Sequence, residues 1–174
     1  MEANKVGGTF RMSNFEVTQR LLSVASRYDV RTEGSETIVM TIKGTLMSAT
    51  PNFSLLEGTE GKELGSLKGN FAKTKFHILD AGGKEQASIE FPSIALKKTL
   101  ALQVGDKTFT ADAGVFKDVF QCKSGDSSVV LEVAKKSGLT AVRDKFIVKV
   151  TDSITQEIGL LAAVAIHSRF FEMV

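Results

Sequence analysis

The chain has 174 residues, a formal net charge of +2 and a hydrophobic fraction of 43%. This length suits a single domain with a sizeable core, and so small an excess of positive charge argues against a nucleic-acid-binding protein. The single cysteine, Cys122, excludes an intramolecular disulfide. Because residues 1–14 also lack the apolar run of a signal peptide, we expect a cytoplasmic protein.

Residues 1–14 are predicted to be a loose lead-in, and residues 15–174 to form one domain. Within this domain a unit of about 24 residues recurs, with a glycine-containing turn in its middle and alternating apolar residues on both sides. Its aromatic or leucine positions, Tyr28, Phe53, Phe76 and Leu100, are 25, 23 and 24 residues apart. A repeat this short predicts one β-hairpin per unit.

Glycine marks the middle of the first four predicted hairpins, at positions 34, 58, 82 and 105, because it adopts the positive φ angles that tight turns need. A fifth hairpin is predicted over residues 115–136 and a sixth over residues 139–151. Six hairpins give about twelve antiparallel strands, which close into a barrel or fold into a sandwich because free edges invite aggregation. A closed barrel of this size is too wide for its own side chains to fill.

The C-terminal segment is predicted to fill that space as a helix over about residues 153–172, with Ser153 and Gln156 as a capping box. Residues 158–166 are apolar on every side, as in a buried helix. Nine apolar residues are too few for a transmembrane span, which needs about 20. The expected fold is therefore mainly β, a closed antiparallel barrel of about twelve strands around a buried C-terminal helix. The predicted packing residues of the helix are Ile154, Ile158, Leu161, Val164 and Ala165.

Residues with catalytic or metal-binding chemistry are few. His77 shares a predicted strand face with Lys75, and His167 lies near the end of the helix, where the helix dipole favours its charge. Cys122 has no CxxC partner and is predicted to be a packed side chain. Two distant histidines and one cysteine give no metal-ligand spacing. We therefore predict a non-enzymatic protein without a metal or cofactor site.

A candidate binding feature is a basic stretch, since residues 62–107 hold eight lysines and five acidic residues. Lys73 and Lys75 are predicted to alternate onto one strand face, and pairing of adjacent hairpins in order would bring other lysines beside them. Lysines near an anionic membrane surface contribute about 1 kcal/mol each. The alternative is a set of solvated outer strand faces. The candidate residues for anionic phospholipid or phosphoinositide headgroups are Lys68, Lys73, Lys75, Lys97 and Lys98.

Three segments carry a family resemblance: GTLMSATPNFSLLEGTEGKELGSLKG, FHILDAGGKEQASIEF and DKFIVKVTDSITQEIGLLAAVAIHSRFF. With these segments in this order, residues 15–172 resemble the LURP-one-related family, which shares a superfamily with the tubby C-terminal domain and the phospholipid scramblases. The resemblance implies a twelve-stranded barrel around a central helix. Tubby domains bind phosphoinositides through surface lysine and arginine residues, so the resemblance also implies a phosphoinositide as a candidate ligand.

The scramblase relationship implies calcium-dependent lipid movement, with acidic residues just before the final helix. Here residues 143–153 contain only Asp144 and Asp152, separated by a predicted strand, whereas Ca²⁺ takes six to eight oxygen ligands. A scramblase-like membrane protein is therefore the least favoured alternative. We expect a monomeric binding module for an anionic lipid headgroup, with a protein-interaction scaffold that binds no lipid as the alternative.

Overall fold

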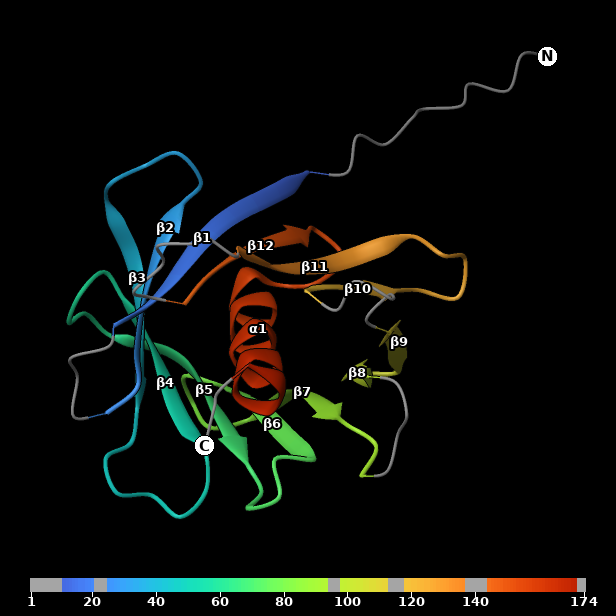
Figure 1. Ribbon diagram of the computed structural model, residues 1–174, viewed down its shortest axis with the longest axis horizontal. Helices are drawn as coiled ribbons and strands as arrows, with labels where there is room; N and C mark the ends of the chain where they lie inside the picture. The colour runs from blue at the N-terminus through green and yellow to red at the C-terminus, as the bar shows by residue number, and fades with distance from the viewer. Residues whose placement is uncertain (1–10, 21–24, 94–97, 113–117, 137–143, 172–174) are drawn as a thin grey trace.

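The structure of the protein, a computed structural model, describes residues 11–20, 25–93, 98–112, 118–136 and 144–171. These residues form twelve antiparallel strands that close into a barrel and one helix, which confirms the predicted fold class (Figure 1). The strands are β1 (Met12–Arg20), β2 (Arg27–Thr32), β3 (Ile38–Gly44), β4 (Asn52–Glu57), β5 (Glu63–Gly69), β6 (Lys75–Asp80), β7 (Glu85–Glu90), β8 (Thr99–Val104), β9 (Lys107–Asp112), β10 (Val119–Lys123), β11 (Val129–Lys136) and β12 (Lys145–Thr151). The helix is α1 (Gln156–Phe170).

Each strand pairs with its neighbour in sequence, and β1 pairs with β12 to close the barrel. The five predicted hairpins from β2–β3 to β10–β11 are present. The sixth differs from the prediction, because β12 pairs with β11 and β1, while residues 139–143 lie outside the described residues. Strand β1 begins at Met12, so residues 12–14 of the expected lead-in belong to the barrel wall.

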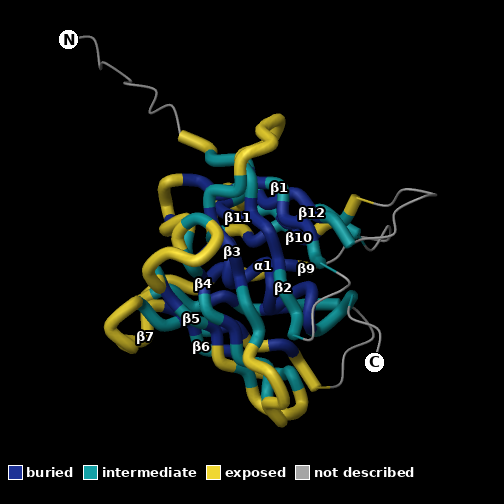
Figure 2. Tube along the Cα trace, turned by 90° about the vertical axis from the view of Figure 1, so that its left-hand side faces the viewer, coloured by how far each residue is buried: buried dark blue, intermediate teal, exposed yellow. Residues whose placement is uncertain are grey.

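Alternation along the strands separates the barrel interior from solvent. In β6, for example, Phe76 and Ile78 are buried while Lys75 and His77 point outwards. The inward side chains form one core together with α1, which lies within the ring of strands, and the exposed residues lie mainly in the connections (Figure 2). The period of two read from the sequence thus places one face of each strand against the helix.

Helix α1 begins later than predicted, because Thr155 and not Ser153 is its N-cap. The Thr155 hydroxyl accepts a hydrogen bond of 3.2 Å from the Ile158 amide, as N-cap side chains do. Asp152 and Ser153 instead form a turn, in which the Ile154 amide donates to the Thr151 carbonyl over 3.4 Å. Ile154 therefore precedes the helix, although its side chain is buried as expected.

Eleven consecutive residues of α1, from 158 to 168, are buried. Ile158, Leu161, Val164 and Ala165 are among them, so the predicted burial of the helix is confirmed. At Gly159 the helix passes so close to β12 that an added Cβ would lie 2.5 Å from a methyl carbon of Val150. In the described part of the chain, no helix is long and apolar enough to cross a membrane.

The two ends of the barrel differ. At one end, here called the turn end, the connections have two to five residues, from the β2–β3 turn to the β12–α1 turn. At the other, the loop end, they have five to eight residues, from β1–β2 to β11–β12. Glycines with positive φ occupy four turn-end connections, and in the β6–β7 turn the residue is Gly83 rather than the predicted Gly82. The helix enters the barrel at the turn end and finishes at the loop end.

Candidate functional site

A ring of large inward side chains surrounds the last turns of α1 at the loop end. Each comes from the second residue of an even-numbered strand, which explains the spacing of the repeat, and all are buried. The ring consists of Tyr28, Phe53, Phe76, Leu100, Phe120 and Phe146. Phe170 of the helix stacks on Phe120 with ring centroids 5.2 Å apart. The repeated aromatic position therefore packs the barrel around the helix end.

One member of the ring forms a polar contact with the helix. The Tyr28 hydroxyl lies 3.1 Å from Nδ1 of His167, and Nε2 of His167 lies 3.0 Å from a carboxylate oxygen of Asp144. With the proton of a neutral imidazole on Nε2, the ring donates to Asp144 and accepts from Tyr28. His167 is 1% exposed and also stacks on Phe146. This histidine thus fastens the helix end to β2 and to the residue before β12.

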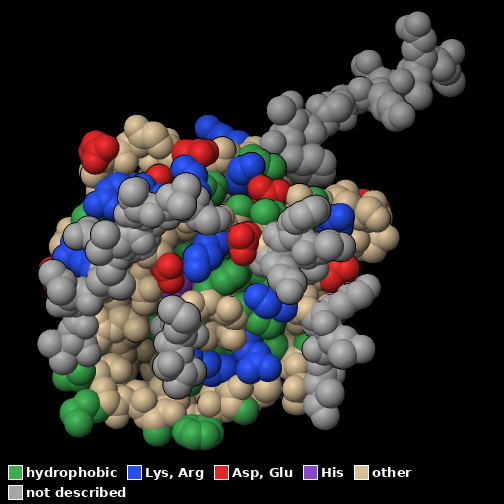
Figure 3. All heavy atoms as spheres, viewed as in Figure 1, with side chains coloured by type: hydrophobic (Ala, Val, Ile, Leu, Met, Phe, Trp, Pro, Cys, Tyr) green, Lys and Arg blue, Asp and Glu red, His purple; other side chains and the backbone are tan. Residues whose placement is uncertain are grey.

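Two of the predicted lysines lie beside the helix end, not on a strand wall. Lys73 belongs to the β5–β6 connection, and its Nζ donates to the Ser168 carbonyl over 3.2 Å. The Nζ of Lys98 lies 5.4 Å and 5.2 Å from the ring centroids of Phe170 and Phe171. Cations are favourable at the carbonyl end of a helix and over aromatic faces. Figure 3 shows Lys and Arg side chains around the area that α1 occupies in Figure 1.

The remaining predicted lysines do not complete a common patch. Lys68 is exposed on the outer face of β5, opposite Asn52 of β4. Lys75 on β6 forms an ion pair of 2.7 Å with Glu90 of β7, and the hydrogen bond that Lys75 donates to Glu90 raises the pKa of Lys75. Lys97 lies outside the described residues. The prediction that Lys73 and Lys75 share a strand face is wrong, because β6 begins only at Lys75.

A different surface feature lies at the loop end. Leu46 and Met47 in the β3–β4 connection and Phe71 in the β5–β6 connection are 52%, 96% and 82% exposed. They are three of the five exposed large hydrophobic residues among those the structure describes. We call them the tip cluster. The two connections lie side by side, since the Gly69 amide donates to the Pro51 carbonyl over 2.7 Å. Hydrophobic side chains project there at the lower edge of Figure 3.

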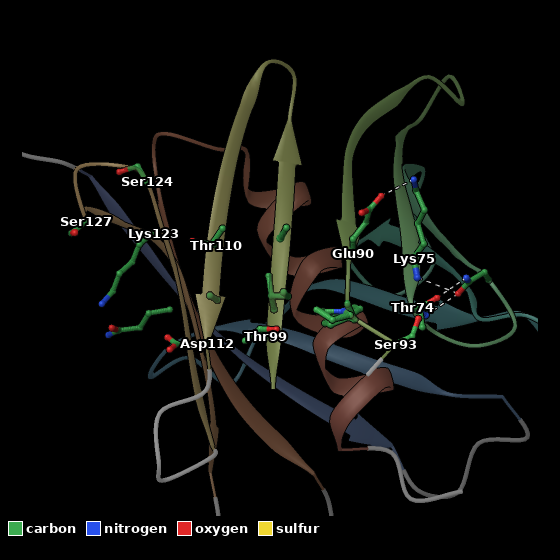
Figure 4. A pocket seen from close by; sticks show the side chains of 17 residues that line it. Thr74, Lys75, Glu90, Ser93, Thr99, Thr110, Asp112, Lys123, Ser124 and Ser127 are labelled. Carbon is green, nitrogen blue, oxygen red and sulfur yellow. Dashed lines mark hydrogen bonds and ion pairs between the residues drawn. The ribbon is translucent and has the colours of Figure 1, made fainter. Parts of the chain in front are cut away.

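A groove of about 950 Å³ lies on the outer wall near β8–β10, where β9 and β10 share a single register pair. Thr99 and Thr110 lie on its floor, with Asp112, Lys123 and Ser124 on one side (Figure 4). The paired Lys75 and Glu90 border the opposite side. Its two cations and two anions balance, so the groove offers no excess charge for an anionic ligand.

The residues with catalytic or metal-binding chemistry remain apart. Cys122 is 1% exposed, and burial raises the pKa of its thiol to about 12, so it is a packed side chain as predicted. His77 pairs with Glu85 on the outer wall at 3.0 Å. Asp144 and Asp152 lie at opposite ends of β12. No group of three His, Cys, Asp or Glu side chains suited to a metal ion occurs in the ranges that the structure covers.

Sequence reasoning missed the tip cluster and the Tyr28–His167 contact. Residues 44–51 lack the alternation of a strand and end in Pro51, which is the signal that could have placed Leu46 and Met47 in a loop. The contact of Tyr28 with His167 joins residues 139 positions apart. Only the closed topology brings them together.

A family model described as LURP-one-related matches residues 13–167, which is most of the chain and extends from β1 to His167, near the end of α1. No curated protein matches the chain.

Proposed function

Since this chain belongs to the LURP-one-related family, we propose that it is a non-enzymatic binding module that docks on anionic phospholipid membranes through the loop end of its barrel. The observation that carries this proposal is the tip cluster, in which Leu46, Met47 and Phe71 project from two neighbouring connections. Large apolar side chains gathered at an exposed edge are typical of an interaction surface.

The size and place of the tip cluster fit the interface of a bilayer. Its side chains stand on connections, so they can enter the headgroup region while the strands stay in water. Burying a side chain of this size contributes about 1.5 to 3 kcal/mol, and interfacial segments reach about 5–10 Å into the boundary. Three such side chains supply the apolar part of a reversible membrane contact.

The charge around the tip cluster fits an anionic surface. Residues 44–52 and 68–75, which hold the two connections, contain three lysines and no acidic residue. Lys68 is exposed on β5, just before the β5–β6 connection. Arg169 reaches this β5–β6 connection, with its Nη1 3.4 Å from the Ala72 carbonyl. Each such cation near an anionic leaflet contributes about 1 kcal/mol. Lys75 adds little, because Glu90 neutralises it.

The placement of the ionisable residues supports a non-enzymatic role. His167 is buried between Tyr28 and Asp144, where it packs the helix end. Cys122 is buried and has a raised pKa, whereas reactive cysteines have a lowered one. The position of Asp144 and Asp152 at opposite ends of β12 argues against a calcium site before the helix.

The proposal is tested by vesicle co-sedimentation of a variant with Leu46, Met47 and Phe71 all changed to Ser. We expect the wild type to bind phosphatidylcholine vesicles that contain phosphatidylserine, with binding weakened by salt, and the triple variant to lose it. The matched control changes Met12 to Ser, since Met12 is an exposed large hydrophobic residue at the start of β1 and so lies at the turn end. Both variants should keep the unfolding free energy within about 0.5 kcal/mol of the wild type per substitution.

Retained binding in the triple variant, or equal loss in the control, would contradict docking through the loop end. Failure of the wild type to bind any anionic vesicle would also contradict it and would favour the protein-interaction scaffold, for which pull-downs with the same two variants are the next experiment.

A further inference from the structure

A row of three cations crosses the outer wall of the barrel on β1, β2 and β3. Arg20 lies directly opposite Arg27, and Arg27 directly opposite Lys43, so the three side chains occupy one level of three neighbouring strands. Like charges opposite one another in a sheet are destabilising. The row therefore depends on anions that lie over it.

Two carboxylates supply that charge in different ways. Asp29, two residues after Arg27 on β2, is buried, and its Oδ2 lies 2.7 Å from Nε of Arg20. Glu60 comes from the β4–β5 turn and bridges the other two cations, with Oε1 3.3 Å from Nη1 of Arg27 and Oε2 in contact with Nζ of Lys43. The hydrogen bond from Lys43 holds the pKa of Glu60 below its usual value, so Glu60 is an anion at neutral pH.

Glu60 is a replaceable occupant of this position. Its side chain is 65% exposed, and exposed ion pairs contribute only about 0 to 1 kcal/mol. The turn that carries it is fixed by other bonds: the Gly58 amide donates to Val39 over 2.9 Å, and the Thr41 hydroxyl donates to the Gly58 carbonyl over 2.8 Å. The carboxylate can therefore rotate away while the turn stays in place.

The cations beneath Glu60 are held in a defined arrangement. The side chain of Arg27 is 17% exposed, and its Nη2 lies 3.4 Å from the Thr59 carbonyl. Its Nε is buried and, within the described residues, has no hydrogen-bond partner, while Oδ1 of Asp29 lies 4.0 Å from it as an ion-pair partner. A planar guanidinium beside an ammonium matches a phosphate group, which offers more acceptor oxygens and more charge than a carboxylate.

We propose that Arg27 and Lys43, with Arg20 beside them, form a binding site for a phosphate-bearing anion that Glu60 occupies in the free protein. The ligand displaces the Glu60 carboxylate and takes its place over the two cations. This site is separate from the tip cluster and does not depend on membrane docking.

The test is isothermal titration with inorganic pyrophosphate at constant ionic strength. Glu60→Gln removes the competing carboxylate and should tighten binding by about three- to tenfold, a gain that misfolding cannot produce. Lys43→Gln should weaken binding. The matched control is Glu90→Gln, which releases Lys75 from another exposed lysine–glutamate pair and should change nothing.

A second arm separates the source of the phosphate. The same variants are compared on vesicles with phosphatidic acid and on vesicles with phosphatidylserine at equal surface charge. A gain for Glu60→Gln with pyrophosphate supports a soluble ligand, and a gain confined to phosphatidic acid supports a lipid headgroup. No gain with either probe, or an equal gain for Glu90→Gln, overturns the proposal. Serine at the three tip-cluster positions leaves the pyrophosphate titration unchanged, so failure of membrane docking is seen separately.

Discussion

The turn end and the loop end of the barrel are built from the same repeat, yet their connections differ in structure. At the turn end the connections close on themselves; Asp80 Oδ1, for instance, accepts hydrogen bonds from the amides of Gly82 and Lys84 at 2.9 Å each. At the loop end the longer connections carry the exposed Met47 and Phe71, and also Lys73, whose Nζ donates to the Ser168 carbonyl near the end of the helix. The repeat determines where the hairpins form, whereas the connections between hairpins can vary and can hold binding residues.

Helix α1 meets the two ends in different ways. Near the turn end it packs against β12 with no space at Gly159, whereas near the loop end it is held by the hydrogen bonds of His167 and by stacked aromatic rings. Substitutions in the middle and at the two ends of the helix should therefore lower the unfolding free energy by different amounts and for different physical reasons.

The largest effect is expected in the middle of the helix, where Leu161 is fully buried. Leu161→Asp places an unpaired charge in the core. An uncompensated buried charge of this kind costs about 3 to 5 kcal/mol of unfolding free energy. We expect little or no folded protein, as measured by urea unfolding followed by circular dichroism. Leu161→Met is the control and should cost less than about 1.5 kcal/mol. A folded, stable aspartate variant would contradict the buried helix.

At the turn end, Gly159→Ala should lower the unfolding free energy by about 1 to 3 kcal/mol, because the new methyl group would overlap Val150. Gly125→Ala is the matched control, since an added Cβ there meets nothing within 4 Å. Urea midpoints of the two variants give the comparison. Equal midpoints would mean that the helix does not approach β12 as closely as described.

At the loop end, Tyr28→Phe should lower the unfolding free energy by about 1 to 2 kcal/mol, because it removes the hydroxyl next to Nδ1 of a buried histidine. A double-mutant cycle with His167→Phe measures the coupling between the two residues, and we expect it to exceed about 0.5 kcal/mol. Additive effects would show that the polar contact does not stabilise this end.

A smaller effect is expected in the β10–β11 turn. The Asp126 carboxylate accepts hydrogen bonds from the Ser124 hydroxyl and the Ser128 amide, which lower its pKa from 3.8 to about 2. A lowered pKa in the folded state stabilises the protein above the unfolded value of 3.8 and loses this contribution as the pH falls through about 2. The stability difference between wild type and Asp126→Asn should therefore shrink on acidification. A difference independent of pH would contradict the assignment.

The barrel and its buried helix were predictable because their signals are local. Alternation such as that of Phe76 and Ile78 identifies a strand, and an apolar run such as residues 158–166 identifies a buried helix. The start of the helix was less predictable, since Ser153 and Thr155 are both suitable caps and only the turn after β12 selects Thr155.

The position of Lys73 was not predictable from alternation. The Asn70 side chain accepts hydrogen bonds from the amides of Thr74 and Lys75, which holds residues 70–74 in a connection and sends Lys73 towards the helix end. The cation row was missed for another reason. Arg20, Arg27 and Lys43 lie on three strands, and only the register of those strands sets them side by side.

The central claim is that the loop end and not the turn end meets the membrane. The chain contains no tryptophan, so Met47→Trp at the loop end and Met12→Trp at the start of β1 are single fluorescent reporters. On addition of phosphatidylserine-containing vesicles, we expect a blue shift of emission and quenching by brominated lipid for Met47→Trp, with Met12→Trp unchanged. A shift of the Met12→Trp reporter, or none in Met47→Trp, would contradict the claim.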